Sequence, residues 1–418
     1  MSGLISLVCC AVQPLRAQAR MAERPLTLRA LLDSVRETHP RILAAQARVR
    51  ALEGSSATAG RLANPVLQFQ MDGASFPNAA AVSGVDRESM TTAMLPLTSL
   101  YARGPRVAQA TASVRAARAD YDGERQRTGL LAAHAFYRVA LAQLSVATNR
   151  DVAAWLDSVV AYNSSRVKEG VTAEADLLRS RLERDRASAE IAMAKAELAQ
   201  AKAELNGFLG HVHLETAVTV GDAPLALPTS GDSISLARPD VLAARERVTA
   251  AQAAVGLERR LVIRDLGVML GSKSTVGTRS MIAGFSIPIP LFDQNAGEIA
   301  RAGAERDVAG FQLAEQERMA VHEVAGAEEA AGLLTAQAMT LSADNYLARA
   351  DEVRRIALGA YREGAVSLLQ VLDAARAWGD ARLTYYRTLY AQHESVLTLI
   401  VARGADIYST PLTPTGIR

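Results

Sequence analysis

The residues best suited to metal or acid–base chemistry are the histidines, and they are scattered along the chain. Of the six, only His211 and His213 are close in sequence, on either side of Val212. A zinc-type site needs further Cys, His or carboxylate ligands at characteristic spacings, and this pair lies in a short connecting segment without a cysteine. We interpret the pair as part of a solvated loop.

Motifs for covalent or phosphate chemistry are missing from the sequence. It contains no phosphate-binding loop, no nucleophile elbow and no paired metal-ligand motif. We therefore predict that the protein is not an enzyme and carries neither a cofactor nor a bound metal.

Polar residues near two glycine turns are the other candidates. Asp176 and Asp373 follow the turns at Gly170 and Gly364, in the early turns of helical patterns. Carboxylates are favoured there by the helix dipole. Ser367 and Gln370 have the spacing of a capping box. Helix stability is the simplest role for these residues.

The composition indicates long, thin helix packing. The chain has 418 residues, of which 5% are aromatic, and alanine recurs in almost every helical segment. Its length would suit two to three ordinary domains. The formal net charge of +2 gives no reason to expect a nucleic-acid partner or an anionic surface.

The N-terminus resembles a secretion signal. Residues 1–19 contain a short apolar run and the small-x-small site Ala17-Gln18-Ala19, although no Lys or Arg precedes the run. Cys9 and Cys10 are the only cysteines, so cleavage would leave none. The alternatives are a plain N-terminal tail and a lipid anchor on Cys10. No later stretch reaches the 18 or more consecutive apolar residues typical of a spanning helix, which leaves a soluble protein or one that spans as β-strands.

Self-comparison shows that the chain is a duplicated unit. "HPRILAAQARVRA" from His39 matches "RPDVLAARERVTA" from Arg238, and "MLPLTSLYARGPRVAQA" aligns with "SIPIPLFDQNAGEIARA". "KEG" ending at Gly170 pairs with "REG" ending at Gly364, and Gly210 falls on Gly404. We predict a first repeat at 20–210, a linker at 211–231, a second repeat at 232–404 and a tail at 405–418.

Each repeat has the pattern helix, strand, strand, long helix, turn, helix. We expect helices at 27–62, 104–165, 172–208, 232–260, 298–360 and 367–403. A 60-residue helix would be about 90 Å long, and the two shorter helices of a repeat could stack as its broken partner. A heptad seam in 172–208 favours close, supercoiled packing; it consists of Ala187, Ile191, Ala194, Leu198, Ala201 and Leu205.

The four expected strands, at 64–73, 89–98, 262–272 and 281–291, are long enough to cross a bilayer when tilted. Each alternates apolar residues, such as Leu67 and Phe69, with small or polar ones, such as Gln68. Four strands cannot close a barrel, and open edges are not tolerated in lipid, so several copies would have to contribute. The alternative is a pair of hairpins that cap a soluble helical bundle.

Prolines favour the barrel interpretation modestly, since proline is confined to special places in a sheet. They fall where strand must change to helix, and we predict that the junctions turn a membrane barrel into a helical tunnel. The junction residues are Pro96, Gly104, Pro288, Pro290 and Gly297.

The sequence "PIPLFDQNAGEIARA", the proline-anchored first helix of each repeat and the two "EG…LL" turns resemble the TolC family of outer-membrane efflux proteins, and most closely its heavy-metal branch. Gln294 and Ala296 depart from that branch, which more often has Arg and Gln there. The resemblance covers about residues 25 to 405.

The resemblance implies a mainly α fold with a transmembrane β-barrel portion, in which a homotrimer forms a 12-stranded barrel continuous with a long α-helical barrel. It implies an outer-membrane exit duct that extends into the periplasm, with outer-membrane lipid, a periplasmic adaptor and an inner-membrane pump as partners. Metal cations, drugs and other small molecules are the candidate substrates.

By the same resemblance, Asp373 and Gln370 fall on ring positions that narrow the periplasmic tip, and Tyr361 and Asp176 match positions that hold it closed. A ring of like charges is costly unless it is solvated or binds a cation, which a selectivity constriction tolerates. The competing hypothesis is a periplasmic adaptor or a soluble coiled-coil scaffold, but the two symmetrical hairpins and turns favour the channel.

Overall fold

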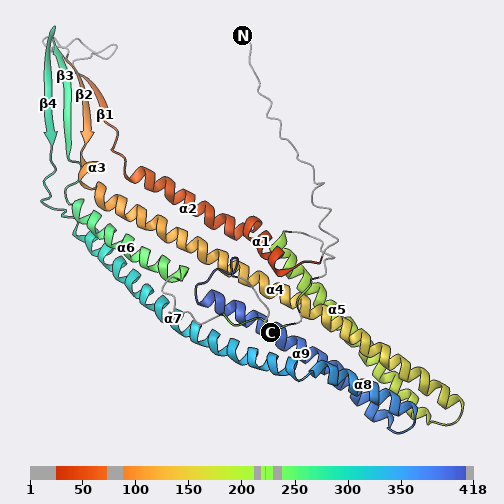
Figure 1. The fold of residues 1–418 in the computed structure, drawn as a ribbon. Coiled ribbons are helices and arrows are strands. Elements are labelled where there is room, and N and C mark those ends of the chain that lie inside the picture. The colour runs from red at the N-terminus through yellow and green to blue at the C-terminus, as the bar shows by residue number, and fades with distance from the viewer. Residues whose placement is uncertain (1–24, 73–87, 211–217, 222, 229–237, 411–418) are drawn as a thin grey trace, which may run out of the picture.

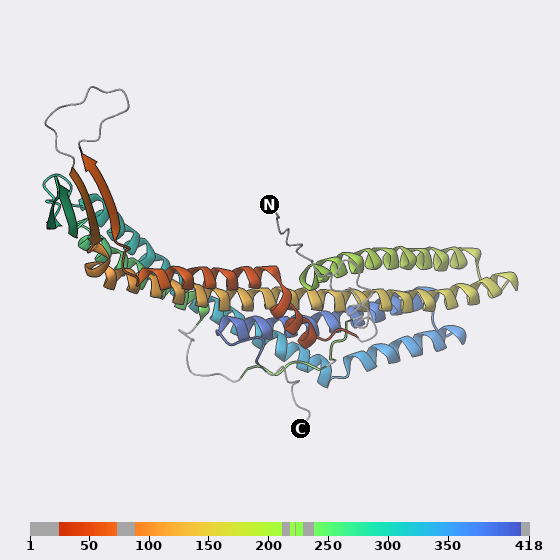
Figure 2. The same cartoon turned by 90° about the horizontal axis from the view of Figure 1, so that it is seen from above.

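An elongated array of helices carries a small β-sheet at one end and two helix turns at the other (Figures 1 and 2). The structure is a computed structural model, and it describes residues 25–72, 88–210, 218–221, 223–228 and 238–410. The predicted signal peptide at 1–19, with Cys9 and Cys10, lies outside the described residues.

The order helix, strand, strand, helix, helix occurs twice, which confirms the predicted duplicated unit. The first copy consists of α2 (Pro40–Ala59), β1 (Val66–Asp72), β2 (Glu88–Pro96), the short α3 (Thr98–Tyr101), α4 (Arg103–Lys168) and α5 (Glu174–Leu209), and the short helix α1 (Leu28–Thr38) precedes it. The second consists of α6 (Pro239–Arg260), β3 (Gly267–Thr275), β4 (Thr278–Ser286), α7 (Ala296–Ala343), α8 (Tyr346–Arg362) and α9 (Leu368–Ala402).

Two helices that the sequence predicted as continuous are broken. The helix expected at 27–62 changes direction at His39, whose extended backbone and ring nitrogen cap α2, and Pro40 begins the new helix. Proline lacks an N–H and is tolerated only in a first helical turn. The helix expected at 298–360 breaks at Asp344 and Asn345, and Asn345 has a φ of 49°. Asparagine is among the residues that enter this left-handed region readily.

Three other boundaries are corrected. Helix α6 begins at Pro239 within the described residues, rather than at 232. Strand β3 covers 267–275 instead of 262–272, because Asp265 has a φ of 59° and interrupts extended structure. Strand β4 ends at Ser286 instead of 291, before the two prolines.

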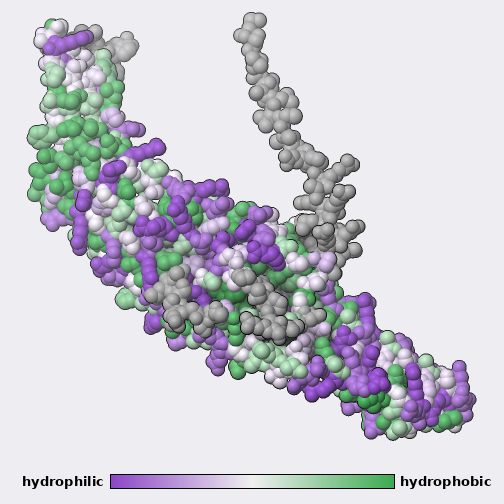
Figure 3. Space-filling view, viewed as in Figure 1, coloured by the Kyte–Doolittle hydropathy of each residue, from purple (hydrophilic) through white to green (hydrophobic). Residues whose placement is uncertain are grey.

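The sheet is antiparallel with the order β1-β2-β3-β4, so that β1 and β4 are its edges. The register places apolar residues on one side, which we call the apolar face: Leu67, Phe69, Met71, Ala93, Leu95, Val268, Leu270, Met281, Ala283 and Phe285. Leu67 is 73% exposed and Phe285 is 77% exposed, and the apolar surface is visible over the strands in Figure 3.

The opposite side, the polar face, carries Gln68, Gln70, Asp72, Glu88, Thr92 and Lys273. Its central residues are less exposed than their neighbours on the apolar face: Thr92 is only 3% exposed, whereas Ala93 is exposed. The sheet is therefore curved around its polar face.

Helix α4 is the centre of the helical array. It packs against α2 and α6 in its first half and against α5 and α9 in its second half (Figure 1). Small side chains permit this close approach: Ala132, Ala133 and Ala140 are all buried. The predicted seam of α5 is confirmed, since Ala187, Ala194, Ala201 and Leu205 are buried and α5 packs on α4.

Two short segments cross the middle of the array. The Gln392 side chain accepts a hydrogen bond from the Leu225 N–H at 2.9 Å and donates to the Leu225 carbonyl at 2.7 Å, which fixes part of the linker. Near the C-terminus, the Tyr408 hydroxyl donates to the Arg125 carbonyl at 3.0 Å. It fits only because Gly129 leaves room, since a Cβ there would lie 2.7 Å from the hydroxyl oxygen.

Among the described residues, α4 is the one helix with an 18-residue stretch apolar enough to cross a membrane. Half of that stretch is buried inside the protein, as expected of the central helix of a packed array.

Candidate gating and docking sites at the helical tip

Both helix turns at the tip end in the same backbone motif. Gly170 follows α4 with a φ of 71° and Gly364 follows α8 with a φ of 78°. The N–H of Val171 bonds to the Arg166 carbonyl at 2.9 Å, and that of Ala365 to the Ala360 carbonyl at 2.8 Å. This is the Schellman arrangement, in which glycine takes the left-handed position without a Cβ penalty. The two turns thus reverse the chain at equivalent points.

The start of α9 has the capping box that its sequence indicates. Gln370 N–H donates to the Ser367 hydroxyl at 3.4 Å, and the Gln370 side-chain oxygen accepts from the Ser367 N–H at 2.8 Å. The Gln370 side chain is therefore engaged by its own helix terminus. Asp176 lies in the first turn of α5 and is half-buried.

The ends of α4 and α8 are joined by a cluster that we call the tip latch: Tyr162, Asn163, Tyr361 and Arg362. The buried Tyr361 hydroxyl donates to Asn163 Oδ1 at 2.5 Å, and the Tyr162 hydroxyl donates to the Arg362 carbonyl at 3.0 Å. The two tyrosine rings meet edge to face, with centroids 5.5 Å apart. The latch thus connects the tip of one repeat to the tip of the other.

Tyr361 acts as a neutral hydrogen-bond donor in this latch. Burial raises the pKa of its hydroxyl, the hydrogen bond to Asn163 lowers it, and the nearby charge of Asp176 raises it. Tyr361 thus bonds to Asn163, while Asp176 contributes through its charge. Sequence reasoning missed Asn163 because no local motif indicates a partner so distant in the chain.

Asp373 lies on the exposed side of α9, one turn after Gln370. Its charge contributes to raising the pKa of the Arg376 guanidinium, although the hydrogen bond from Arg376 to Glu183 contributes more. Gln370 and Leu369 are also exposed, and Leu369 is 61% exposed. Asp373 is therefore a solvated carboxylate next to an unpartnered apolar side chain.

The strand-to-helix junction residues lie where the chain leaves the sheet. Pro96 is the last residue of β2, while Gly104 and Gly297 are the second residues of α4 and α7. Pro288 and Pro290 lie in the segment between β4 and α7.

A buried asparagine fixes the second junction and was not singled out from the sequence. Asn295 is 3% exposed with a φ of 58°, and its amide donates to the Glu258 carbonyl at 2.8 Å and to a Glu258 carboxylate oxygen at 2.9 Å. Arg264 donates to its side-chain oxygen. Asn295 thus connects the start of α7 to the end of α6.

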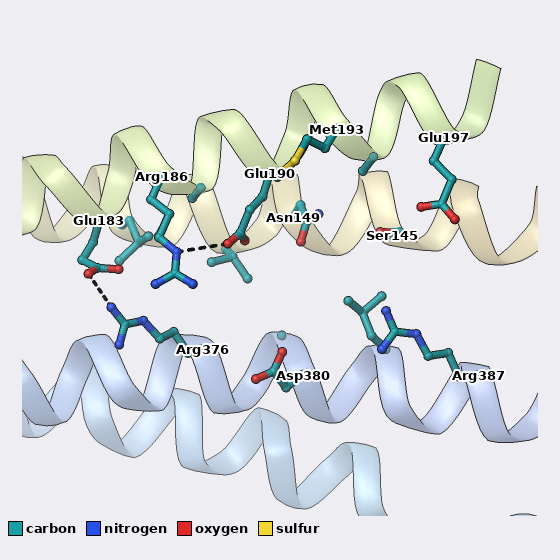
Figure 4. A pocket seen from close by; sticks show the side chains of 16 residues that line it. Ser145, Asn149, Glu183, Arg186, Glu190, Met193, Glu197, Arg376, Asp380 and Arg387 are labelled. Atoms are coloured by element: carbon teal, nitrogen blue, oxygen red, sulfur yellow. Dashed lines mark hydrogen bonds and ion pairs between the residues drawn. The ribbon is translucent and has the colours of Figure 1, made fainter. Parts of the chain in front are cut away.

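A groove runs between α5 and α9 above α4, behind the tip, and we call it the α5/α9 groove (Figure 4). Small residues line its two sides, Ala187 and Ala194 on α5 and Gly379 on α9, and α4 contributes both polar and apolar residues to its floor. Glutamates recur every seventh residue on the α5 side: Glu183, Glu190 and Glu197. Glu204 continues the series at a neighbouring hollow that also contains Arg387.

Some charges in this groove are paired and others are not. Arg376 on α9 bonds to Glu183, and Arg186 bonds to Glu190 at 3.3 Å. Glu197, Asp380 and Arg387 point into the groove (Figure 4), and none of them makes an ion pair within the part of the chain that the structure describes. The groove therefore presents free charges of both signs.

Metal ligation has no support among the described residues, which contain no group of three or more His, Cys, Asp or Glu side chains able to hold an ion. His211 and His213 lie outside the described ranges.

An open sheet with an apolar face, joined through proline-containing junctions to a duplicated helical array, is the fold of outer-membrane channel subunits. The chain belongs to the outer membrane efflux protein family, whose model matches residues 31–211 and 232–405. It is a protein of the outer membrane with a helical part that extends into the periplasm.

Its relatives include the cobalt-zinc-cadmium resistance protein CzcC of Cupriavidus metallidurans, which is 27% identical over 91% of this chain and 90% of its own length. Among solved structures, the fold matches CusC with a TM-score of 0.75 at 21% identity, covering 90% of this chain and 92% of that one. It also matches the outer membrane protein VceC of Vibrio cholerae, with a TM-score of 0.73 at 19% identity, covering 90% of this chain and 96% of that one.

Proposed function

We propose that three copies of this chain form the exit duct of a tripartite efflux system. The observation that carries the proposal is the sheet, which has two open edges, β1 and β4, and one exposed apolar face. Unpaired edges are excluded from lipid, and three four-stranded sheets would close them into one barrel. The two helical repeats would continue that barrel across the periplasm.

The gate of this duct is at the helical tip. Three copies of Asp373 would face one another around the axis, and their solvated carboxylates would form a cation-attracting constriction. The tip latch would hold the α8–α9 hairpin against α4 in the closed state. Gln370 has a lesser role, since its side chain caps α9.

The proposed cargo is a metal cation. Support comes from the similarity to a protein named for cobalt, zinc and cadmium resistance, and from the acidic residue at the proposed constriction. Transport would be passive, with the driving force supplied by an inner-membrane pump.

The α5/α9 groove is the proposed docking surface for a helix of the periplasmic adaptor. The small residues on its α5 and α9 sides would let a helix approach closely. Its free charges would pair with an adaptor helix that presents a basic residue to Glu197 and an acidic one to Arg387. Charge reversal at Glu197 should reduce adaptor capture, and Glu190, which Arg186 already neutralises, provides the matched control.

Ion conductance in a planar lipid bilayer tests the channel. We expect discrete, long-lived steps from the detergent-extracted protein, and Asp373→Asn should reduce cation selectivity. Asp380→Asn, on the same helix, is the control and should leave selectivity unchanged. Protein that stays soluble without detergent and gives no conductance would contradict the duct and favour an adaptor or a scaffold.

The latch has its own test. Tyr361→Phe removes the hydroxyl that bonds to Asn163 and keeps the ring contact with Tyr162. We expect a larger open probability at unchanged selectivity. Tyr346→Phe, at the other end of α8, is the control, and an equal effect of both variants would argue against a latch.

A further inference from the structure

Methionine is concentrated in the sheet. Five of the ten methionines of the chain lie in its four strands, which together make up less than a tenth of the residues. Met71 and Met281 are on the apolar face, where long apolar side chains are expected. Met90, Met94 and Met269 are on the polar face, among Gln68, Thr92 and Lys273.

Two of these three form a direct cross-strand pair. Met94 of β2 is opposite Met269 of β3 in the register, and directly opposed side chains have Cβ atoms about 5 Å apart. Both side chains are half-buried. Met90 lies about 13 Å further along β2, opposite Lys273.

Glycines shape the surroundings of the pair. A Cβ at Gly267 would lie 3.0 Å from the Met94 methyl carbon, and one at Gly284 would lie 3.4 Å from that of Met269. Each thioether thus leans over a glycine on the next strand, and both lean in the same direction. The register places both side chains, with their sulfur atoms, on the polar face of the sheet.

Apolar burial alone does not call for sulfur at these positions, because leucine would supply a purely apolar side chain of similar volume. The thioether adds a soft, uncharged electron-pair donor, which selects soft cations over hard ones. Two such donors match the low coordination numbers that monovalent d10 cations accept. A site of this kind holds the ion weakly, as conduction through successive sites requires.

We propose that Met94 and Met269 form a contact site for soft monovalent cations of the Ag⁺ and Cu⁺ class on the inner wall of the barrel. The placement on the wall rests on the proposed function, whereas the pair itself lies within one chain. Met90 is not part of the site, because the Lys273 ammonium opposite it, paired with Glu88 at 2.5 Å, disfavours a second cation.

The test is a titration of the purified full-length protein with silver nitrate in chloride-free buffer, followed by NMR of ¹³C-labelled methionine methyl groups. We expect the methyl signals of Met94 and Met269 to shift together, with little change at Met90, Met71 and Met281. In the M94L/M269L variant we expect Ag⁺ to bind at least tenfold more weakly. The matched control is M71L/M281L, which removes two methionines from the apolar face and should bind as the native protein does.

Equal shifts at methionines of both faces, or binding in M94L/M269L within twofold of the native protein, would overturn the site. Conductance of the same samples separates this result from the proposed function. Channels that conduct but do not bind Ag⁺ at the pair refute the site alone. Methyl shifts at the pair in protein that does not conduct refute the duct and leave the site in place.

Discussion

In both repeats the helix before the first strand, α2 or α6, begins with a proline, but the residue before that proline makes different contacts in the two repeats. In the first repeat, His39 precedes Pro40, caps α2 and stacks on Phe208 with ring centroids 5.7 Å apart. In the second, Arg238 precedes Pro239 and is 8% exposed. Its guanidinium donates to Asp240 at 2.6 Å, to Glu323 at 2.7 Å and to the Ala402 carbonyl at 3.2 Å.

The long helices differ in the opposite sense. The long helix of the first repeat, α4, runs unbroken from Arg103 to Lys168, whereas its counterpart in the second repeat is divided into α7 and α8 at Asn345. The second repeat is thus fixed near its middle by the hydrogen bonds of Arg238, which we call the clamp, and its long helix is interrupted toward the tip at Asn345. The two repeats share one order of elements but have diverged. The first has a continuous long helix, whereas the second has a buried arginine with several partners near its middle and a helix break toward the tip.

Removal of the clamp should have the largest effect. Arg238→Ala removes the partner of the half-buried Asp240 and of the more exposed Glu323. We expect this to cost about 2–3 kcal/mol, mainly through Asp240 and the buried Arg238 side chain, because both carboxylates stay partly solvated. The measurement is the free energy of local opening at the start of α6, from amide hydrogen exchange.

The control for the clamp is Arg247→Ala. Arg247, which is also on α6, bonds to the Asp120 carboxylate on α4 at 2.6 Å, but both side chains are largely exposed. We expect less than about 1 kcal/mol there. Equal effects of the two variants would show that the second repeat has no special clamp.

Substitution of the glycine that ends the last helix of each repeat should have the next largest effect on stability. Gly404→Ala combines a φ of 78° with Arg238 atoms 3.2 Å from the new Cβ, whereas Gly210→Ala has a φ of 70° and open space. We expect about 2 kcal/mol or more for Gly404 and about 1 kcal/mol for Gly210. Thermal unfolding followed by circular dichroism measures both, and the reverse order would contradict the denser packing of the second repeat.

His39→Ala should cost about 1 kcal/mol through the lost cap and should change the response to acid. Burial and the charge of Arg41 lower the pKa of His39 from 6.5. The unfolded chain then takes up a proton that the folded chain refuses, so the stability that His39 contributes is present above pH 6.5 and is lost as pH falls through the folded pKa. A pH series of native and His39→Ala protein should show this loss in the native protein alone.

The second repeat should lose stability on acidification at a lower pH than the first. Burial alone would raise the pKa of Asp240, but the hydrogen bonds and charge of Arg238 lower it below 3.8. Its stabilising effect is therefore fully present above that pH and is lost as pH falls through the folded pKa. Acid loss of structure that begins at α6 rather than α2 would contradict this order.

The joint at Asn345 should give the smallest change. Glycine adopts a positive φ freely and asparagine does so better than most residues, so Asn345→Gly should alter stability by less than about 0.5 kcal/mol. Asn345→Ala favours a continuous helix like α4 and should slow the opening of α8 amides. Hydrogen exchange across residues 340–350 compares the two variants.

Sequence reasoning was most successful where a pattern is local and repeated. The duplication, the alternation of the strands and the alanine-rich seam of α5 all follow from spacing, and spacing fixes which side of an element is buried. The break at His39 carried a signal, Pro40, that could have been used. The break at Asn345 had only an asparagine to indicate it, and a single residue competes poorly with long helical periodicity.

The candidate sites were less predictable because their contacts are distant in sequence. The hydrogen bond from Tyr361 to Asn163 joins residues of different repeats, and the three partners of Arg238 come from α6, α7 and the end of α9. The roles of Asp373 and of the junction residues stay predictions, since they concern an assembly of several chains.

The uninterrupted course of α4 gives the molecule a fixed length scale. This one helix reaches from the sheet to the tip. The number of residues in α4 therefore determines how far the protein extends into the periplasm. A single inserted residue would turn everything beyond it by about 100° and spoil the packing on α5 and α9. Changes in span should thus occur in whole heptads, about 10 Å each, made together in all the helices alongside. Relatives adapted to envelopes of other thickness would then differ by discrete steps.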